Sequence, residues 1–175
     1  MEKYVPDSYY KNIFEINYKK LKEEGISLLL FDLDNTLAPF NKIECEIEVK
    51  ELFDKLKEEG MKVIIFSNSP RRRLEKFKEQ LNVDFVSSAN KPLSQKFLST
   101  LKKEHKKESE TVMIGDQLIT DIQGGNKVGI YTILVDPISD YDPFWTKILR
   151  KREKKIKSIL RKKGLFKGRY YEEKV

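Results

Sequence analysis

The sequence predicts an α/β fold built on a doubly wound parallel sheet. Short apolar segments alternate along the chain with segments whose apolar residues recur at helical spacing. The apolar segments are nearly continuous, which is typical of strands that are covered on both faces. Strands that alternate with helices favour a parallel sheet with right-handed crossovers. Ligands bind such sheets beyond the carboxyl ends of the strands, so the residues that follow each strand are the candidates for function.

Five strands are predicted, each a short run rich in Ile, Val, Leu or Phe. They span residues 27–33, 62–66, 85–87, 111–114 and 131–135. Together with the helices between them they give the order β-α-β-α-β-α-β-α-β. A helix is also expected before Gly25, in the amino-terminal segment.

The helices between the strands are indicated by apolar residues at spacings of three and four. The expected core-facing residues are Val49, Leu52, Phe53 and Leu56 in one helix, Leu74, Phe77 and Leu81 in the next, and Leu93, Phe97 and Leu101 in a third. Gly60 is expected to end the first of these helices. Ser69 and Pro70 are typical of an N-cap followed by proline at the first helical position, which predicts the start of the second.

The charge of the chain is unevenly distributed. The 175 residues carry a net charge of +7, but residues 147–175 hold 13 Lys and Arg against three Asp and Glu. Residues 1–146 hold 22 basic and 25 acidic residues, a net charge of −3. We therefore divide the chain into a body, residues 1–146, that includes the amino-terminal helix, and a basic helical tail, residues 147–175, that packs on the body or extends from it.

The length and composition favour a single core in a soluble, cytoplasmic protein, with a peripheral position at a membrane as the alternative. The longest charge-free apolar run is too short to span a bilayer, and the charged amino terminus is unlike a secretory signal. The sequence leaves the number of subunits undefined. Cys45, the single cysteine, lies between Glu44 and Glu46, a setting that disfavours a reactive thiolate.

Two carboxylates, Asp32 and Asp34, follow the first predicted strand. Side chains alternate along a strand, so both are expected on the same side at its carboxyl end. Two like charges held that close require neutralisation, and Mg²⁺ prefers carboxylate and carbonyl oxygens. The alternative is an ordinary acidic turn after a strand.

Polar residues also follow the other strands. Ser67 and Asn68 come directly before a helix, where hydrogen-bond donors can receive an anion, although capping alone is the alternative. Lys91 follows the third strand, and Asp116 and Asp121 follow the fourth, where they are also suited to capping a helix. Because all four strand ends lie at one edge of a parallel sheet, we expect these side chains to form one site.

These segments resemble the motifs of the haloacid-dehalogenase-like (HAD) phosphotransferase superfamily. The four motifs are matched by FDLDNTL (31–37), SNSP (67–70), Lys91 and GDQLITD (115–121). The resemblance implies a Rossmann-like, HAD-like fold, a catalytic nucleophile at Asp32 that forms an aspartyl phosphate, and a general acid and base at Asp34.

The same resemblance implies the remaining roles at the site. Mg²⁺ is expected to be bound by Asp32, the backbone carbonyl of Asp34, and Asp116, with Asp121 close by. Ser67 and Asn68 are expected to bind the transferring phosphoryl group, and Lys91 to neutralise it and orient the nucleophile. Phosphoryl transfer asks a protein mainly for such positioning and positive charge.

The spacing of the motifs leaves no room for a cap domain. Leu37 and Ser67 are 30 positions apart, and Asn68 and Lys91 are 23 positions apart; one helix and one strand fill most of each gap. In this superfamily a cap usually closes over small metabolites. A capless member is expected to take a bulky substrate, such as a phosphoprotein, a nucleic-acid end or a phospholipid headgroup.

A narrower resemblance, to the YqeG-type class IIIA branch, covers nearly the whole chain. It rests on the segment before the first motif, on the glycines after Asp121, and on Thr146, Arg150 and Glu153. Relatives of that branch include mitochondrial phosphatidylglycerophosphate phosphatases, whose first motif tends to have lysine where this chain has Leu33.

Two functions are therefore compared. The first is a magnesium-dependent phosphomonoester hydrolase with an open site, acting on phosphatidylglycerophosphate. The second is an RNA-associated or ribosome-associated assembly factor that uses the basic tail. In the tail, Trp145, Ile148, Leu149, Ile156, Ile159 and Leu160 fall roughly on one helical face. That pattern fits a helix docked on its own domain as well as one that meets an anionic membrane or RNA.

Overall fold

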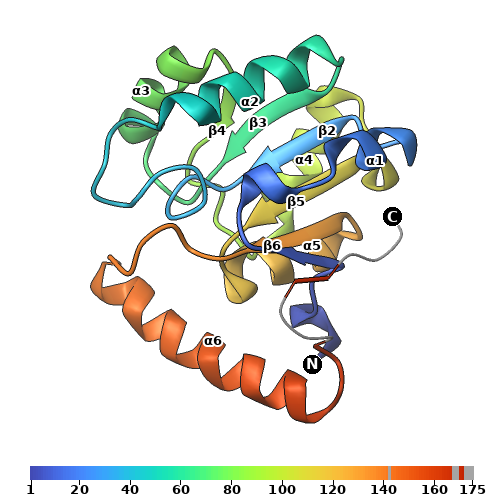
Figure 1. The fold of residues 1–175 in the computed structure, drawn as a ribbon, viewed down its shortest axis with the longest axis vertical. Coiled ribbons are helices and arrows are strands. Elements are labelled where there is room, and N and C mark those ends of the chain that lie inside the picture. Colours follow the sequence, from blue (N-terminus) through green and yellow to red (C-terminus); the bar gives the residue numbers. More distant parts are fainter. Residues whose placement is uncertain (142, 167–169, 172–175) are drawn as a thin grey trace.

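A six-stranded parallel sheet forms the centre of the computed structural model, which describes residues 1–141, 143–166 and 170–171 (Figure 1). The strand order is β1-β6-β5-β2-β3-β4, and every neighbouring pair is parallel. The strands are β1 (Ser8–Tyr10), β2 (Leu28–Phe31), β3 (Lys62–Phe66), β4 (Asp84–Val86), β5 (Thr111–Gly115) and β6 (Tyr131–Val135). The predicted doubly wound α/β fold is confirmed.

Helices cover both faces of the sheet, and the alternation of side chains along each strand divides the core in two. Leu29 and Phe31 of β2 pack with one set of helices, whereas Leu28 and Leu30 pack on the opposite face. The first set is α1 (Tyr18–Glu23), α2 (Ile47–Glu58) and α3 (Arg71–Leu81); the opposite face carries α4 (Ser94–Glu104) and α5 (Gln123–Val128). Because both faces are covered, the strands need apolar residues at successive positions.

Two of the predicted strands have the observed bounds, and three differ at their ends. The strands at 62–66 and 131–135 are as predicted, whereas β4 is displaced by one residue and β5 extends to Gly115. The first strand ends at Phe31, so the expected alternation does not run on through Asp34.

Strand β1 was missed, and only a helix was expected in the amino-terminal segment. That segment holds α1 as well as β1 and two short 3₁₀ turns, Glu2–Tyr4 and Ile13–Glu15. The three residues of β1 pair with β6, for example Ser8 with Ile133. A strand this short has no readable periodicity, and its partner is more than 120 residues away in the sequence.

Two details of the helix predictions were wrong. Helix α3 begins at Arg71, after Pro70, and Ser69 forms no side-chain cap with it; its hydroxyl contacts Asp34 instead. Leu93 is 53% exposed because it precedes the first turn of α4 in an extended conformation. The other core residues predicted for these two helices are buried, namely Leu74, Phe77 and Leu81 in α3 and Phe97 and Leu101 in α4. Gly60 ends α2 with a positive φ, as expected.

Helix α6 (Phe144–Lys162) lies along the edge of the domain beside β6 (Figure 1). Its buried face meets the sheet through Leu160, which packs with Tyr9, Leu134 and the following Phe166. The helix begins before the expected boundary at residue 147, and the side chain of Trp145 lies outside the described residues. Within the described ranges, none of the helices has the length and apolar character of a membrane-spanning segment.

Within residues 28–115, no inserted domain covers the carboxyl ends of the strands. Residues 28–115, all of which the structure describes, contain β2 to β5, α2 to α4 and a single 3₁₀ turn, Glu108–Glu110. Each of these elements belongs to the sheet or to a layer next to it. The capless architecture expected from the motif spacing is therefore present over this range.

Candidate active site

A cavity of about 460 Å³ opens at the carboxyl ends of the central strands. The predicted residues Asp32, Asp34, Ser67, Asn68 and Lys91 all line it. They meet there because β2 lies between β3 and β5 in the sheet, so the loops that follow these strands are neighbours. The cavity therefore lies where parallel sheets bind their ligands.

Lys91 lies between two carboxylates at the base of this site. Its Nζ is 2.6 Å from Asp32 Oδ1 and 2.6 Å from Asp121 Oδ1, and its side chain is only 2% exposed. Burial alone lowers the pKa of Lys91, but the charges of Asp121 and Asp32 outweigh that effect and raise it. Lys91 is therefore a permanent positive charge at the site.

Three buried carboxylates, those of Asp32, Asp116 and Asp121, form a cluster beside Lys91. Each offers an oxygen, and these oxygens lie within 4.8 Å of one another. Burial raises the pKa of Asp32 well above its usual range, against the charge of Lys91, and raises that of Asp116 to about 6. The three carboxyl groups are in contact with two cationic groups, Lys91 and Arg150.

This donor set fits a divalent cation. Oxygen ligands suit Mg²⁺, which is usually held by one or two carboxylates together with waters and substrate phosphate. A cation here supplies the positive charge that the cluster lacks. The carboxylate of Asp34 is not part of this cluster, so its side chain is not placed as a ligand.

Gly115, the last residue of β5, leaves the space that Asp121 occupies. A Cβ built on it falls 2.3 Å from Asp121 Oδ2 and 2.4 Å from Cγ, although its backbone conformation suits any residue. Asp121 is fully buried, and its carboxyl group and a methyl group at position 115 cannot both occupy this space. We expect Gly115→Ala to displace Asp121 and to weaken Mg²⁺ binding at least about tenfold, measured by titration calorimetry.

Gly124→Ala is the matched control. Its Cβ falls 2.8 Å from the ring of Phe97, in the apolar core on the α4 face of the sheet. This variant is expected to lower the melting temperature as an overpacked core does, yet to keep the affinity of the folded protein for Mg²⁺. Equal affinities in the Gly115 and Gly124 variants would contradict the role given to Gly115.

The carboxylate of Asp34 is held by α3. Arg73 donates to Asp34 Oδ1 from Nε at 3.1 Å and from a terminal nitrogen at 2.7 Å, and Ser69 Oγ lies 2.5 Å from Oδ2. The guanidinium of Arg73 also packs against the rings of Phe40 and Phe77. Asp34 is thus fixed at the wall of the cavity by a two-point contact with one guanidinium and by the Ser69 hydroxyl.

Asn68 and Ser67 shape the loop around Lys91. The side chain of Asn68 accepts from the backbone N–H of Lys91 at 2.8 Å and donates to its carbonyl at 3.2 Å. Ser67 Oγ accepts from the backbone N–H of Ser69 at 3.1 Å. Both residues line the cavity, and Asn68 also fixes the backbone that carries Lys91.

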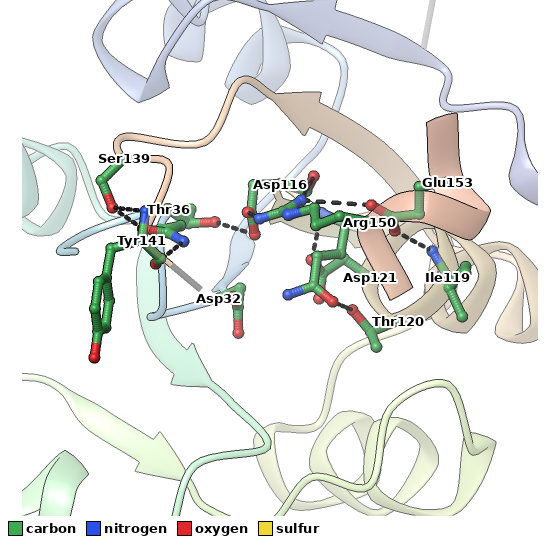
Figure 2. A network of polar contacts seen from close by, with 12 residues as sticks. Asp32, Thr36, Asp116, Ile119, Thr120, Asp121, Ser139, Tyr141, Arg150 and Glu153 are labelled. Atoms are coloured by element: carbon green, nitrogen blue, oxygen red, sulfur yellow. Dashed lines mark hydrogen bonds and ion pairs between the residues drawn. The ribbon is translucent and has the colours of Figure 1, made fainter. Parts of the chain in front are cut away.

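Helix α6 reaches the site through Arg150 and Glu153 (Figure 2). Arg150 donates to the carboxylate of Asp116 and, at 3.0 Å, to its backbone carbonyl. Glu153 lies 3.4 Å from Arg150 and accepts from the backbone N–H of Ile119 at 2.9 Å. Burial raises the pKa of Glu153 to about 7, although the Ile119 N–H and Arg150 oppose this shift.

The raised pKa of Glu153 predicts a pH dependence of stability. Between pH 4.5 and 7 the folded protein binds more protons at this residue than the unfolded chain does, so its contribution to stability falls as pH rises. Glu153→Gln removes this titrating group. As pH rises from 4.5 to 7, the free energy of unfolding of the variant is therefore expected to increase relative to that of the parent by up to about 3 kcal/mol. Urea unfolding from pH 4.5 to 8 measures it; parallel curves for the two proteins would contradict it.

Several contact residues had no role predicted from their sequence patterns. Ser69 was interpreted as a helix cap, Arg73 lay within a basic helical segment, and Arg150 and Glu153 entered only through the narrower resemblance. The run Arg71 to Arg73, directly after the second motif, was the one local signal of positive charge near the site. The run does not show which of the three arginines turns inward.

Comparison with known proteins identifies the family. Residues 44–129 match the model of the haloacid dehalogenase-like hydrolases. The chain is 40% identical over 161 residues to the probable phosphatase YqeG of Bacillus subtilis, covering 92% of this chain and 94% of that protein. It is 28% identical to phosphatidylglycerophosphate phosphatase 1 of Arabidopsis thaliana, covering 92% of this chain but only 49% of that protein.

Solved structures agree with the fold. A cobalt-bound deoxy-D-mannose-octulosonate 8-phosphate phosphatase from Haemophilus influenzae superposes with a TM-score of 0.56 at 16% identity, covering 74% of this chain and 77% of that one. At this identity the likeness concerns the architecture alone. The family model and the extended similarity to YqeG, together with the fold, show that this chain belongs to the haloacid dehalogenase-like hydrolases and is a phosphatase of that family.

Proposed function

We propose that this chain is a Mg²⁺-dependent phosphomonoester hydrolase that works through an aspartyl phosphate on Asp32. The observation that carries the proposal is that Asp32 lines an open cavity with Lys91 Nζ 2.6 Å from its carboxylate and Asp34 on the same cavity wall. A nucleophile, a fixed positive charge and a second carboxylate are the groups that phosphoryl transfer through a carboxylate requires.

In the first step, an oxygen of Asp32 attacks phosphorus and the bond from phosphorus to the substrate alcohol breaks. Asp34 gives a proton to the departing oxygen. In the second step, Asp34 takes a proton from water, the water oxygen attacks phosphorus, and the bond to Asp32 breaks to release phosphate. The contacts from Arg73 and Ser69 orient the Asp34 carboxyl group at the cavity wall for both transfers.

Asp32, Asp116 and Asp121 would hold the cation, with the backbone carbonyl of Asp34 as the further ligand that the family implies. When bound, Mg²⁺ supplies positive charge to the oxygens of the transferring phosphoryl group. Lys91 neutralises the same group from the protein side, and Ser67 and Asn68 line the cavity in which it would bind.

The surroundings of the cavity favour a substrate at a membrane surface. Phe40, Pro70, Pro143 and Leu149 give the cavity an apolar rim. The loop that follows β6 is tied to Asn35 through Ser139 and Tyr141, and it exposes Tyr141 and Ile138 beside the site. Exposed apolar side chains around a phosphate site are suited to contact with lipid.

The outer face of α6 is suited to an anionic surface. The exposed residues of this helix include Lys147, Lys151, Arg152, Lys154, Lys155 and Lys162. The first turns of the same helix line the cavity through Thr146 and Leu149, so the helix that carries the basic residues begins at the site. Basic side chains near anionic lipid contribute about 1 kcal/mol each.

We therefore infer that the substrate is the phosphomonoester headgroup of an anionic phospholipid, with phosphatidylglycerophosphate as the first to test. The similarity to the Arabidopsis phosphatase of that name supports this choice. RNA is the other polyanion that a basic helix attracts, and it is the alternative substrate that the test below includes.

The test is hydrolysis of a panel of phosphomonoesters with and without Mg²⁺: p-nitrophenyl phosphate, phosphatidylglycerophosphate in phosphatidylglycerol vesicles, and 5′-phosphorylated RNA. The lipid is expected to be the best substrate. Hydrolysis of p-nitrophenyl phosphate alone would refute the lipid and keep the hydrolase, whereas preference for RNA would replace the lipid as substrate. Activity without any divalent cation would refute the metal dependence.

Charge variants test the role of the helix. The triple variant Lys151→Gln, Lys154→Gln and Lys155→Gln is expected to lower kcat/KM on the vesicles about tenfold or more and to leave p-nitrophenyl phosphate hydrolysis unchanged. The control replaces three exposed lysines of α1 and α2 by Gln, namely Lys19, Lys22 and Lys55. Equal losses in both triple variants would contradict a specific role for α6.

A further inference from the structure

Arg150 holds Asp116 at two points. One terminal nitrogen contacts the carboxylate oxygen Oδ2, and the other donates to the backbone carbonyl at 3.0 Å (Figure 2). The second carboxylate oxygen of Asp116 accepts from Thr36 Oγ at 3.3 Å. Because one guanidinium binds both the backbone and the side chain, it fixes the rotamer of Asp116 as well as balancing its charge.

Glu153 fixes Arg150 in turn. It lies one helical turn further along α6, is 3% exposed, and connects Arg150 with the backbone N–H of Ile119. Ile119 belongs to a π-helical turn, Leu118–Ile122, which also carries Asp121. Arg150 therefore joins α6 to Asp116 directly, and Glu153 joins the helix to the turn that carries Asp121.

We propose that Arg150 is a positioning residue that presets Asp116 for the divalent cation, and that Glu153 presets Arg150. Asp116 is 1% exposed and has no access to water that would orient it. Groups that orient metal ligands in this way typically change metal affinity 10- to 100-fold when they are removed. Helix α6 then contributes to the metal site from its buried face, independently of its basic outer face.

Two other roles are possible for the same contacts, and they predict different results. If Arg150 only docked α6, its loss would lower the stability of the metal-free protein without changing the affinity for Mg²⁺. If Arg150 were a counter-charge that competes with the cation, its loss would strengthen Mg²⁺ binding, because one repelling positive charge would be gone.

The experiment measures Mg²⁺ binding to the metal-free full chain by titration calorimetry, without substrate. Arg150→Met is expected to raise the Kd for Mg²⁺ at least about tenfold. Arg150→Lys keeps the charge but replaces the planar fork by a single ammonium, and we expect its affinity to stay closer to that of the Met variant than to that of the parent. Arg152→Met, an exposed arginine two residues along the same helix, is the matched control and should bind as the parent does.

An unchanged or lower Kd in Arg150→Met would overturn the proposal, as would full recovery in Arg150→Lys, which would show that charge alone matters. Circular dichroism and thermal unfolding without metal establish that each variant is folded. If Arg150→Met fails to fold, Arg150→Lys against Arg152→Lys gives the same comparison, and equal affinities there count against the proposal.

The inference rests on the metal site of the proposed function, and the two fail in different ways. Absence of Mg²⁺ binding by the parent protein would refute the site itself. Binding by the parent with equal affinity in Arg150→Met would refute only the role of Arg150.

Discussion

Asp32→Asn is expected to lower phosphatase activity by at least about a thousandfold at saturating Mg²⁺. The amide keeps the size of the side chain but has no anionic oxygen to attack phosphorus, so no covalent intermediate can form. Acid-quenched mass spectrometry should detect a phosphoryl adduct on the parent protein during turnover and none on the variant. The fold is expected to survive, because an amide placed 2.6 Å from Lys91 Nζ still accepts its hydrogen bond.

Asp54→Asn is the control for this variant. Asp54 lies on α2 and is partly exposed, where it pairs with Lys50 and Lys57 far from the cluster. Its replacement should leave turnover unchanged. Retained activity in Asp32→Asn, or a phosphoryl adduct that persists on this variant, would show that Asp32 is not the nucleophile. Either result would also refute the proposed two-step reaction.

Lys91→Met is expected to abolish activity and to destabilise the protein by about 3–5 kcal/mol at neutral pH. Lys91 is the partner of two buried carboxylates, Asp32 and Asp121, so its removal leaves both without their shared ion pair. Lys62→Met is the control, because Lys62 is 41% exposed and its ion pair with Asp84 lies at the surface. That change should cost less than about 1 kcal/mol.

The loss in Lys91→Met should depend on pH in a definite direction. Without Lys91 the pKa of Asp32, already raised by burial, rises further. The folded variant then binds more protons than its unfolded chain, so its stability relative to the parent falls as pH rises. Urea unfolding at pH 5 and pH 8 measures this, and Mg²⁺ should partly restore stability at pH 8. A deficit that is equal at both pH values would contradict the charge explanation.

The strands and the motif residues that follow them were predictable because each depends on local sequence. The runs at residues 62–66 and 131–135 are apolar throughout, and a parallel sheet covered on both faces requires this. Asp32, Ser67 and Lys91 line one cavity because each follows a strand of the same parallel sheet. The alternation of strands and helices along the chain already implies such a sheet. Strand β1 was not predictable, because its identity depends on pairing with β6 at the other end of the chain.

The contacts of the two carboxylates in the first motif could not be predicted from the local sequence pattern. Alternation predicted that Asp32 and Asp34 would act from one side of a strand, and both do line the cavity. Their contacts nevertheless differ: Asp32 pairs with Lys91, while Asp34 turns to Arg73 and Ser69. Strand β2 ends at Phe31, and the turn that follows separates the two carboxyl groups.

The sequence by itself determined the α/β class, the motif residues, the capless spacing and the concentration of positive charge after residue 146. Each of these follows from residue type and separation along the chain. Only the tertiary structure decided that α6 turns Arg150 onto Asp116, with Glu153 beside Arg150, while most of the other basic residues of the helix are exposed. In a helix where nearly every position outside the apolar face is charged, periodicity does not distinguish an arginine that turns inward from one that is fully solvated. The carboxylate that selects Arg150 lies 34 residues earlier, and folding alone brings the two together.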